Sequence, residues 1–126
     1  MEPIFIGIDV AKDRLDVHVQ PSGQAFAVTR DESGLAALQG RLQSLQPGLI
    51  ALEATGGYEV VVVATLAAAR LPVVVVNPRQ IREFARATGR LAKTDALDAR
   101  AIAAFAATVR PAVRPVPDAQ ALSGSS

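Results

Sequence analysis

Apolar residues near the start of the chain follow the two-residue period of β-strands. Residues 4–9 (IFIGID) form a short apolar run, typical of a buried strand that ends at or just past Asp9. In residues 14–20 (RLDVHVQ), leucine and valine alternate with polar residues, which predicts a half-buried strand. A third strand is expected over 24–30, after a Pro-Ser-Gly turn. The short connections predict that these three strands form an antiparallel meander.

From residue 31 the period changes to that of a helix. Leucines spaced three and four apart predict an amphipathic helix over 31–45, with Asp31 or Ser33 as its N-cap. Two short apolar strands are expected at 49–53 and 72–76. The segment between them, 58–70, has four valines that favour a strand, but its length favours a helix. We predict the helix, because a crossover must link the two strands.

Two further helices are expected after the last strand. A proline at the first helical position predicts one over 78–87, with a break at Gly89. Thr94 is a good N-cap for a final helix that runs to about Thr108.

The element order, β-β-β-α-β-α-β-α-α, predicts the fold class. It indicates an α/β fold with a mixed five-stranded sheet flanked by helices, which is the order of the ribonuclease H-like fold. We expect residues 1–108 to form one domain of ordinary size. Residues 109–126, which contain three prolines and end in Ser and Gly, are expected to be a linker or tail.

Composition excludes some kinds of site. The chain has no cysteine, so disulfides and cysteine-bound metals are excluded. No apolar run approaches the ~20 residues of a membrane span, and we expect a cytoplasmic protein without a membrane partner. The net charge of only +1 hides a basic segment. Its cations lie at Arg79, Arg82, Arg86, Arg90 and Lys93, against the single acid Glu83.

Four acids point to a metal site. Asp9 and Glu53 each end an apolar strand, where an unpaired buried acid is costly. Asp95 and Asp98 are spaced i and i+3, which would put them on one face of the last helix. If that helix packs across the ends of the strands, the four carboxylates converge, and such oxygen ligands suit Mg²⁺. The other reading of Asp95 and Asp98 is an ordinary acidic first turn, which the helix dipole favours.

Three segments together resemble a known family: FIGIDVAKDRLDVHV, LEATGGYE and VVVVNPRQIREFARATGRLAKTDALDARAIAAFA. They are similar to the N-terminal domain of the DEDD-type insertion-sequence transposases of the IS110 family, whose members include RNA-guided recombinases. The resemblance implies a RuvC-like domain in which Asp9, Glu53, Asp95 and Asp98 are catalytic and bind Mg²⁺, with Mn²⁺ as a substitute. It also implies DNA as substrate, a guide RNA as partner, and homo-oligomers of the full-length protein.

The family also carries a catalytic serine in a second, C-terminal domain. No serine of the tail matches a motif, so we expect that this chain lacks the nucleophile and does not complete strand exchange alone. Two other functions stay open. One is a stand-alone Holliday-junction resolvase or nuclease that uses the same acids. The other is a non-catalytic nucleic-acid-binding assembly module.

The remaining candidate residues have both a functional and a structural interpretation. Lys12 and the five cations between 79 and 93 are expected to contact nucleic-acid phosphates, whereas the alternative is a solvated surface. Tyr58, which follows Gly56 and Gly57, could stack on a base or cover the core. His18 has no partner motif and is expected to be a surface residue.

Overall fold

The computed structural model describes residues 3–54, 56–89 and 98–111. The strands in these ranges are β1 (Phe5–Val10), β2 (Arg14–Gln20), β3 (Ala25–Thr29), β4 (Leu49–Glu53) and β5 (Val73–Val76). The helices are α1 (Glu32–Leu45), α2 (Glu59–Ala68), α3 (Pro78–Ala87) and α4 (Ala99–Val109). This order confirms the predicted one, including the helix chosen for the valine-rich segment.

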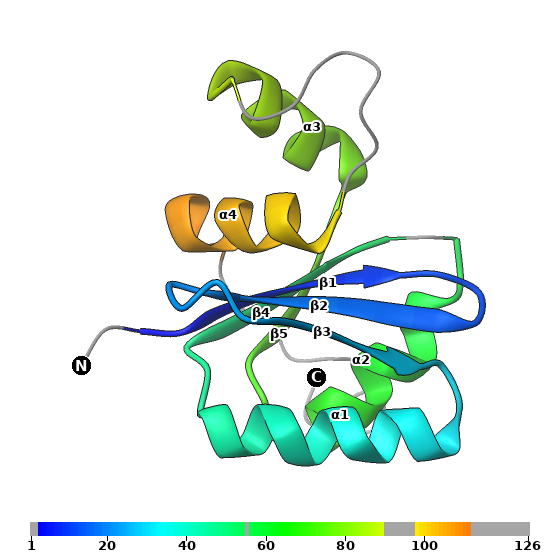
Figure 1. Ribbon diagram of the computed structural model, residues 1–126. Helices are drawn as coiled ribbons and strands as arrows, with labels where there is room; N and C mark the ends of the chain where they lie inside the picture. The colour runs from blue at the N-terminus through cyan, green and yellow to red at the C-terminus, as the bar shows by residue number, and fades with distance from the viewer. Residues whose placement is uncertain (1–2, 55, 90–97, 112–126) are drawn as a thin grey trace, which may run out of the picture.

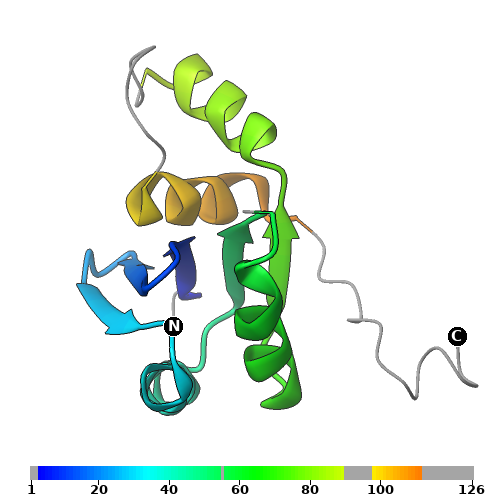
Figure 2. The same cartoon turned by 90° about the vertical axis from the view of Figure 1, so that its right-hand side faces the viewer.

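The strands form one mixed sheet in the order β3-β2-β1-β4-β5. The first three strands pair antiparallel, as a meander, and β4 and β5 continue the sheet in parallel from β1. Helices α1 and α2 cover one face, which we call the α1/α2 face (Figure 1). Helix α4 covers the other, the α4 face, and α3 stands on the outer side of α4 (Figure 2). The mixed α/β fold predicted from the element order is therefore confirmed.

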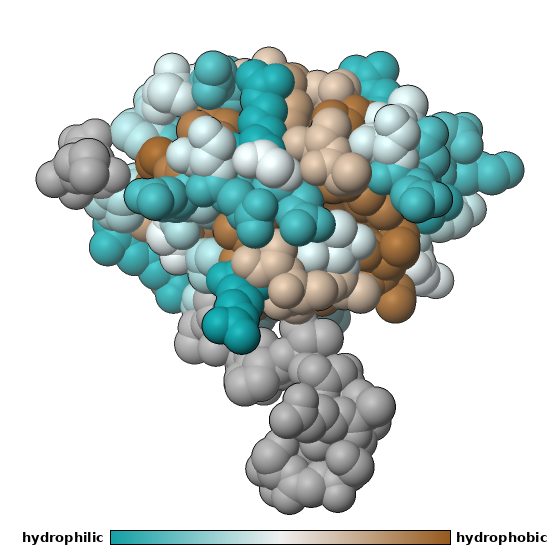
Figure 3. Space-filling model, turned by 90° about the horizontal axis from the view of Figure 1, so that it is seen from below, coloured by the Kyte–Doolittle hydropathy of each residue, from teal (hydrophilic) through white to brown (hydrophobic). Residues whose placement is uncertain are grey.

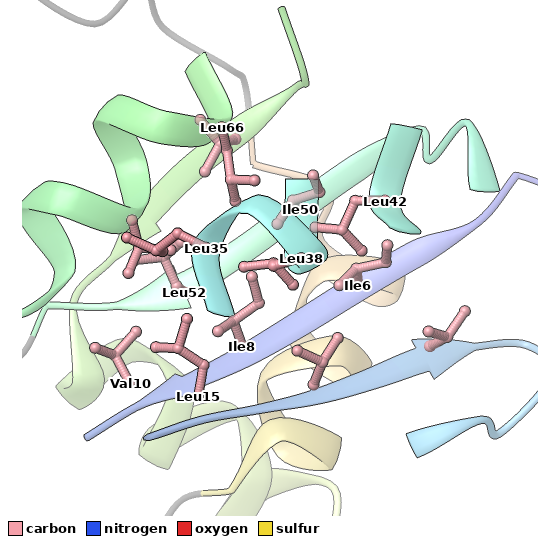
Figure 4. Packing of buried hydrophobic residues seen from close by; sticks show 14 residues of the cluster. Ile6, Ile8, Val10, Leu15, Leu35, Leu38, Leu42, Ile50, Leu52 and Leu66 are labelled. Carbon is pink, nitrogen blue, oxygen red and sulfur yellow. The ribbon is translucent and has the colours of Figure 1, made fainter. Parts of the chain in front are cut away.

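The α1/α2 face carries the larger part of the core. Alternation along β1 and β2 turns Ile6, Ile8 and Leu15 toward α1, whose Leu38 and Leu42 are fully buried among them (Figure 4). Viewed from the side of these helices, the outer surface mixes polar residues with apolar ones (Figure 3).

The core of the α4 face is smaller and is built for close approach. Gly7 of β1 lies directly under α4, where an added Cβ would come 2.3 Å from both the backbone nitrogen of Ala103 and the carbonyl oxygen of Ala99. Farther along the same face, Phe105 of α4 packs on Phe5 and meets the Phe84 ring of α3 edge-on, with centroids 5.6 Å apart. Because Gly7 has no side chain, the helix backbone can rest on the central strand.

The beginning of the last helix differs from the prediction. Asp98 has an extended backbone (φ −130°, ψ 175°), and its carboxylate accepts a hydrogen bond from the backbone N–H of Ala101 at 2.9 Å. Asp98 is therefore the N-cap, and the helix begins at Ala99, about one turn later than expected. The prediction that Asp98 lies inside the helix is wrong, because aspartate at this position satisfies the free N–H groups itself. Thr94 and Asp95 lie outside the described residues.

No helix within the described ranges is both long and apolar enough to span a membrane.

Candidate active site

Asp9 lies near the end of the central strand β1, on the α4 face of the sheet. Side chains alternate along a strand, so Asp9 shares this face with Gly7 and Phe5, which lie under α4. Its neighbour across the antiparallel pair is Asp16 of β2, and Asp16 in turn pairs with Ala27 of β3. The register therefore places two aspartates side by side at one end of the sheet.

Glu53 joins them from the other side of β1. Strands β1 and β4 are parallel, and Ile8 pairs with Leu52, so the residues that follow, Asp9 and Glu53, lie at the same level. Parallel strands present their carboxyl ends at the same end of the sheet, so these two acids lie side by side there. Both side chains are partly buried.

Asp98 reaches the same end of the sheet from above. Helix α4 passes over Gly7 with Ala99 and Ala103, so its first residue lies next to the end of β1 that carries Asp9. Asp98, the N-cap, is exposed at this point. Its place depends on Gly7, since any side chain there would lift the helix away from the strand.

The electrostatics show that these acids interact. The pKa of Asp9 is raised, first by burial and then by the negative charges of Asp16 and Asp98. The pKa of Glu53 is raised by burial and by Asp9, while Arg82 of α3 acts in the opposite direction. Each raised pKa reports a carboxylate whose charge lacks full compensation, which is the condition that a bound cation relieves.

Of the four acids predicted from the sequence, three lie in the described part of the structure. Asp9, Glu53 and Asp98 lie at the same end of the sheet, whereas Asp95 falls outside the described residues. Within the described ranges, no three Asp, Glu or His side chains already form a group that could hold a metal ion. The donors are all carboxylate oxygens, which fit a hard divalent cation such as Mg²⁺.

Asp16 lies beside these acids, and its place there is not predicted from the sequence alone. Its carboxylate accepts two hydrogen bonds from the Arg14 guanidinium, at 2.7 and 3.0 Å. The alternation of residues 14–20 already placed both side chains on the polar face of their strand. Only the register with β1 brings Asp16 opposite Asp9, and a single sequence does not give that register.

The basic segment is only partly described. Arg79, Arg82 and Arg86 are exposed on α3, and Arg79 lies 4.0 Å from Glu83 in a loose ion pair. The helix ends at Ala87, and Gly89 has a φ of 72°, which agrees with the predicted break. Arg90 and Lys93 lie outside the described residues.

Lys12, Tyr58 and His18 have different surroundings. Lys12 is exposed in the turn after β1, and its carbonyl accepts a hydrogen bond from Nε of Arg30 at 2.6 Å. The same guanidinium lies 4.9 Å from the centroid of the Tyr58 ring, which is 42% exposed and so adds little to the core. His18 is half-buried rather than a plain surface residue, and burial together with Arg100 lowers its pKa.

Comparisons with known proteins identify the family and the fold. A sequence model of a transposase family, the DEDD transposases of the IS110 type, matches residues 6–123. A solved structure of RuvC from T. thermophilus, in complex with a Holliday junction substrate, aligns with a TM-score of 0.61 at 19% sequence identity. The alignment covers 91% of this chain and 100% of that one, and it shows a shared RuvC-like fold. No curated protein sequence matches the chain.

Proposed function

The chain belongs to the DEDD transposases of the IS110 type, enzymes that cut and rejoin DNA, and on this premise we propose that its acid cluster is the metal-binding half of the catalytic site. We define the acid cluster as Asp9, Glu53, Asp95 and Asp98. The observation that carries the proposal is the placement of three of these acids, from two strands and a helix N-terminus, at one end of the sheet.

The acid cluster would hold Mg²⁺, and Mn²⁺ would replace it. When bound, such ions would supply Lewis-acid stabilisation for the attacking and leaving oxygens of a phosphodiester. The protein's own contribution is placement. Gly7 lets α4 descend onto β1, which sets the carboxylate of Asp98 near that of Asp9.

The cations of α3 supply the neighbouring surface for nucleic acid. Arg82 lies close enough to Glu53 to oppose the rise in the pKa of that carboxyl group. The exposed arginines of α3 therefore lie next to the acid cluster. We assign phosphate contacts with DNA, or with a guide RNA, to six cations. These are Lys12, Arg79, Arg82, Arg86, Arg90 and Lys93.

The proposal extends to the organisation of the active enzyme. Residues 1–108 act as the metal-binding catalytic domain, and residues 109–126 connect it to the serine nucleophile of a second domain. Homo-oligomers then bring together the strands that are exchanged.

Thermal unfolding in a Mg²⁺ titration tests the metal site. A ligand that binds only the folded state raises its stability by RT ln(1 + [L]/Kd), or ~2.7 kcal/mol at a hundredfold excess over Kd. We expect a rise in Tm for the wild type and none for Asp9→Asn. Asp31→Asn is the matched control, because Asp31 is an exposed helix N-cap on the α1/α2 face and asparagine also caps helices.

Two outcomes would contradict the proposal. One is a wild type whose Tm does not respond to Mg²⁺ or Mn²⁺. The other is a response that Asp9→Asn and Asp31→Asn reduce equally, which would indicate general screening of acids. Cleavage of branched DNA by the chain alone would keep the metal site but replace the recombinase with a nuclease.

A further inference from the structure

A hollow next to the acid cluster lies over β2 and β3. Helix α4 packs mainly on β1, β2 and β4 and leaves the α4 face of β3 uncovered. On this face β3 presents the exposed alanines Ala25 and Ala27, which pair with His18 and Asp16 of β2. The resulting hollow measures about 390 Å³ and ends against Asp98 and Arg100 at the start of α4. Its size falls within the ~300–1,000 Å³ range of ligand sites.

The walls of the hollow combine two arginines with two acids. Arg14 is held by Asp16, whereas Arg100 is exposed and forms no hydrogen bond or ion pair within the described ranges. Asp98 belongs to the acid cluster, and Asp16 lies beside Asp9. Arg14 already compensates Asp16, and a cation in the acid cluster would compensate Asp98, so that Arg100 would leave the hollow with a net positive potential.

We propose that this hollow seats the sugar-phosphate backbone of a DNA strand next to the phosphodiester at the acid cluster. The inference rests on the function proposed above, because the acids supply the reason for a strand to run here. The two alanines give room and an apolar floor for a deoxyribose. Arg100 contacts the phosphate at the rim, and its planar guanidinium suits phosphate oxygens. The hollow therefore fixes the direction in which the strand leaves the site.

Disulfide trapping tests where the strand lies. The chain has no cysteine, so Ala27→Cys introduces a single thiol into the hollow. Ala68→Cys is the matched control, an exposed alanine on α2 at the opposite face. With a single-stranded oligodeoxynucleotide that carries a thiol tether on one backbone phosphate, in Mg²⁺, we expect trapping by Ala27→Cys at least tenfold faster. Equal rates for the two variants would overturn the inference.

The salt dependence of DNA binding tests the role of Arg100. Each phosphate contact to a single strand contributes ~0.7 to the slope of log K against log salt. Arg100→Ala should lower the slope by about that amount and weaken binding several-fold. Arg70→Ala, which removes an exposed arginine at the end of α2, should leave both unchanged. A slope that does not differ between Arg100→Ala and the wild type would overturn the assignment of Arg100.

The two proposals can fail separately. Arg100→Ala should keep the Mg²⁺-dependent rise in Tm, since Arg100 is no metal ligand. A normal Mg²⁺ response with no preferential trapping would overturn the hollow and leave the metal site standing. Trapping by Ala27→Cys in a wild-type background without any Mg²⁺ response would support the hollow and overturn the metal site.

Discussion

The two faces of the sheet are built from different residues for different purposes. Toward α1 and α2 the sheet presents branched aliphatic side chains that fill the space between layers, with residues such as Ile8, Leu38 and Leu52 fully buried. Toward α4 it presents Gly7 and then Asp9 on the same strand. The helix packs on this strand through alanines. One face is filled by large aliphatic side chains, whereas the other brings a helix backbone close to a strand with an acid near its end.

The difference shows where this domain gives up stability for function. Closely packed aliphatic side chains stabilise a fold, and like charges brought together in a partly buried site destabilise it. The raised pKa values of Asp9 and Glu53 are the direct sign of that cost. A substitution on the α1/α2 face should therefore change stability alone. One on the α4 face should change stability and the metal response together.

The largest effect on stability is expected from Leu38→Ala. Leu38 is fully buried between α1 and the sheet, and Leu→Ala substitutions in cores cost about 2–5 kcal/mol. Urea unfolding measures the loss, and a Mg²⁺ titration of the folded variant should still raise its Tm. If Leu38→Ala abolished the metal response, the two faces would be coupled, and the comparison would not hold.

Gly7→Ala should cost less but should remove the metal response as well. The new methyl group would meet backbone atoms of Ala99 and Ala103, which cannot turn aside as a flexible side chain would. Overpacking of this kind costs ~1–3 kcal/mol. It also shifts α4, and with it Asp98, away from Asp9. Urea unfolding and the Mg²⁺ titration together measure both consequences.

Gly40→Ala is the control on the other side of the sheet. Gly40 lies in the exposed part of α1, with no atom within 4 Å of an added Cβ. Alanine should raise stability there by ~0.5–1 kcal/mol, because glycine is a poor helix former. A Gly7→Ala variant that bound Mg²⁺ like the wild type would show that close packing of α4 is not needed for the site.

The sequence predicted the α1/α2 face better than the α4 face for a physical reason. Hydrophobic periodicity reports which residues face a core, so the element order and the bounds of β2 and β4 are predicted correctly. The pairing of Asp9 with Asp16 depends on strand register, and the closeness of Asp98 depends on the packing at Gly7. Both are tertiary properties that leave no periodic trace in one sequence.

The caps of α1 and α4 give a smaller effect. Asp31 and Asp98 both accept a hydrogen bond from a first-turn N–H, at 2.7 and 2.9 Å. Asp98→Ala should lose ~1 kcal/mol, the usual contribution of an N-cap, together with the metal response. Asp98→Asn should keep the cap and lose only the metal response. If calorimetry found full Mg²⁺ binding by Asp98→Asn, Asp98 would be a cap and nothing more.

The smallest effect concerns pH and has opposite signs on the two faces. Without metal, the pKa of Asp9 is higher in the folded protein than its ordinary value of 3.8. The free energy of unfolding therefore falls as the pH rises from 3.8 through the pKa of the folded state, because the folded protein resists ionisation of Asp9. Asp9→Asn removes this cost, so at pH 7 its Tm should exceed that of the metal-free wild type by a few degrees. The difference should vanish near pH 3.

Asp31 behaves in the reverse way, because hydrogen bonds from Gly34 and Thr29 lower the pKa of its carboxyl group. Its ionised form stabilises the fold. That stability is lost as the pH falls from the ordinary pKa of an aspartate to the lower pKa of Asp31 in the folded protein. Asp31→Asn should therefore melt below the wild type at pH 7 and approach it in acid. Opposite pH trends in the Tm of Asp9→Asn and Asp31→Asn would distinguish an acid that binds a cation from one that stabilises the fold. Parallel trends would mean that the pKa of Asp9 is not raised by burial, and the electrostatic evidence for the acid cluster would be contradicted.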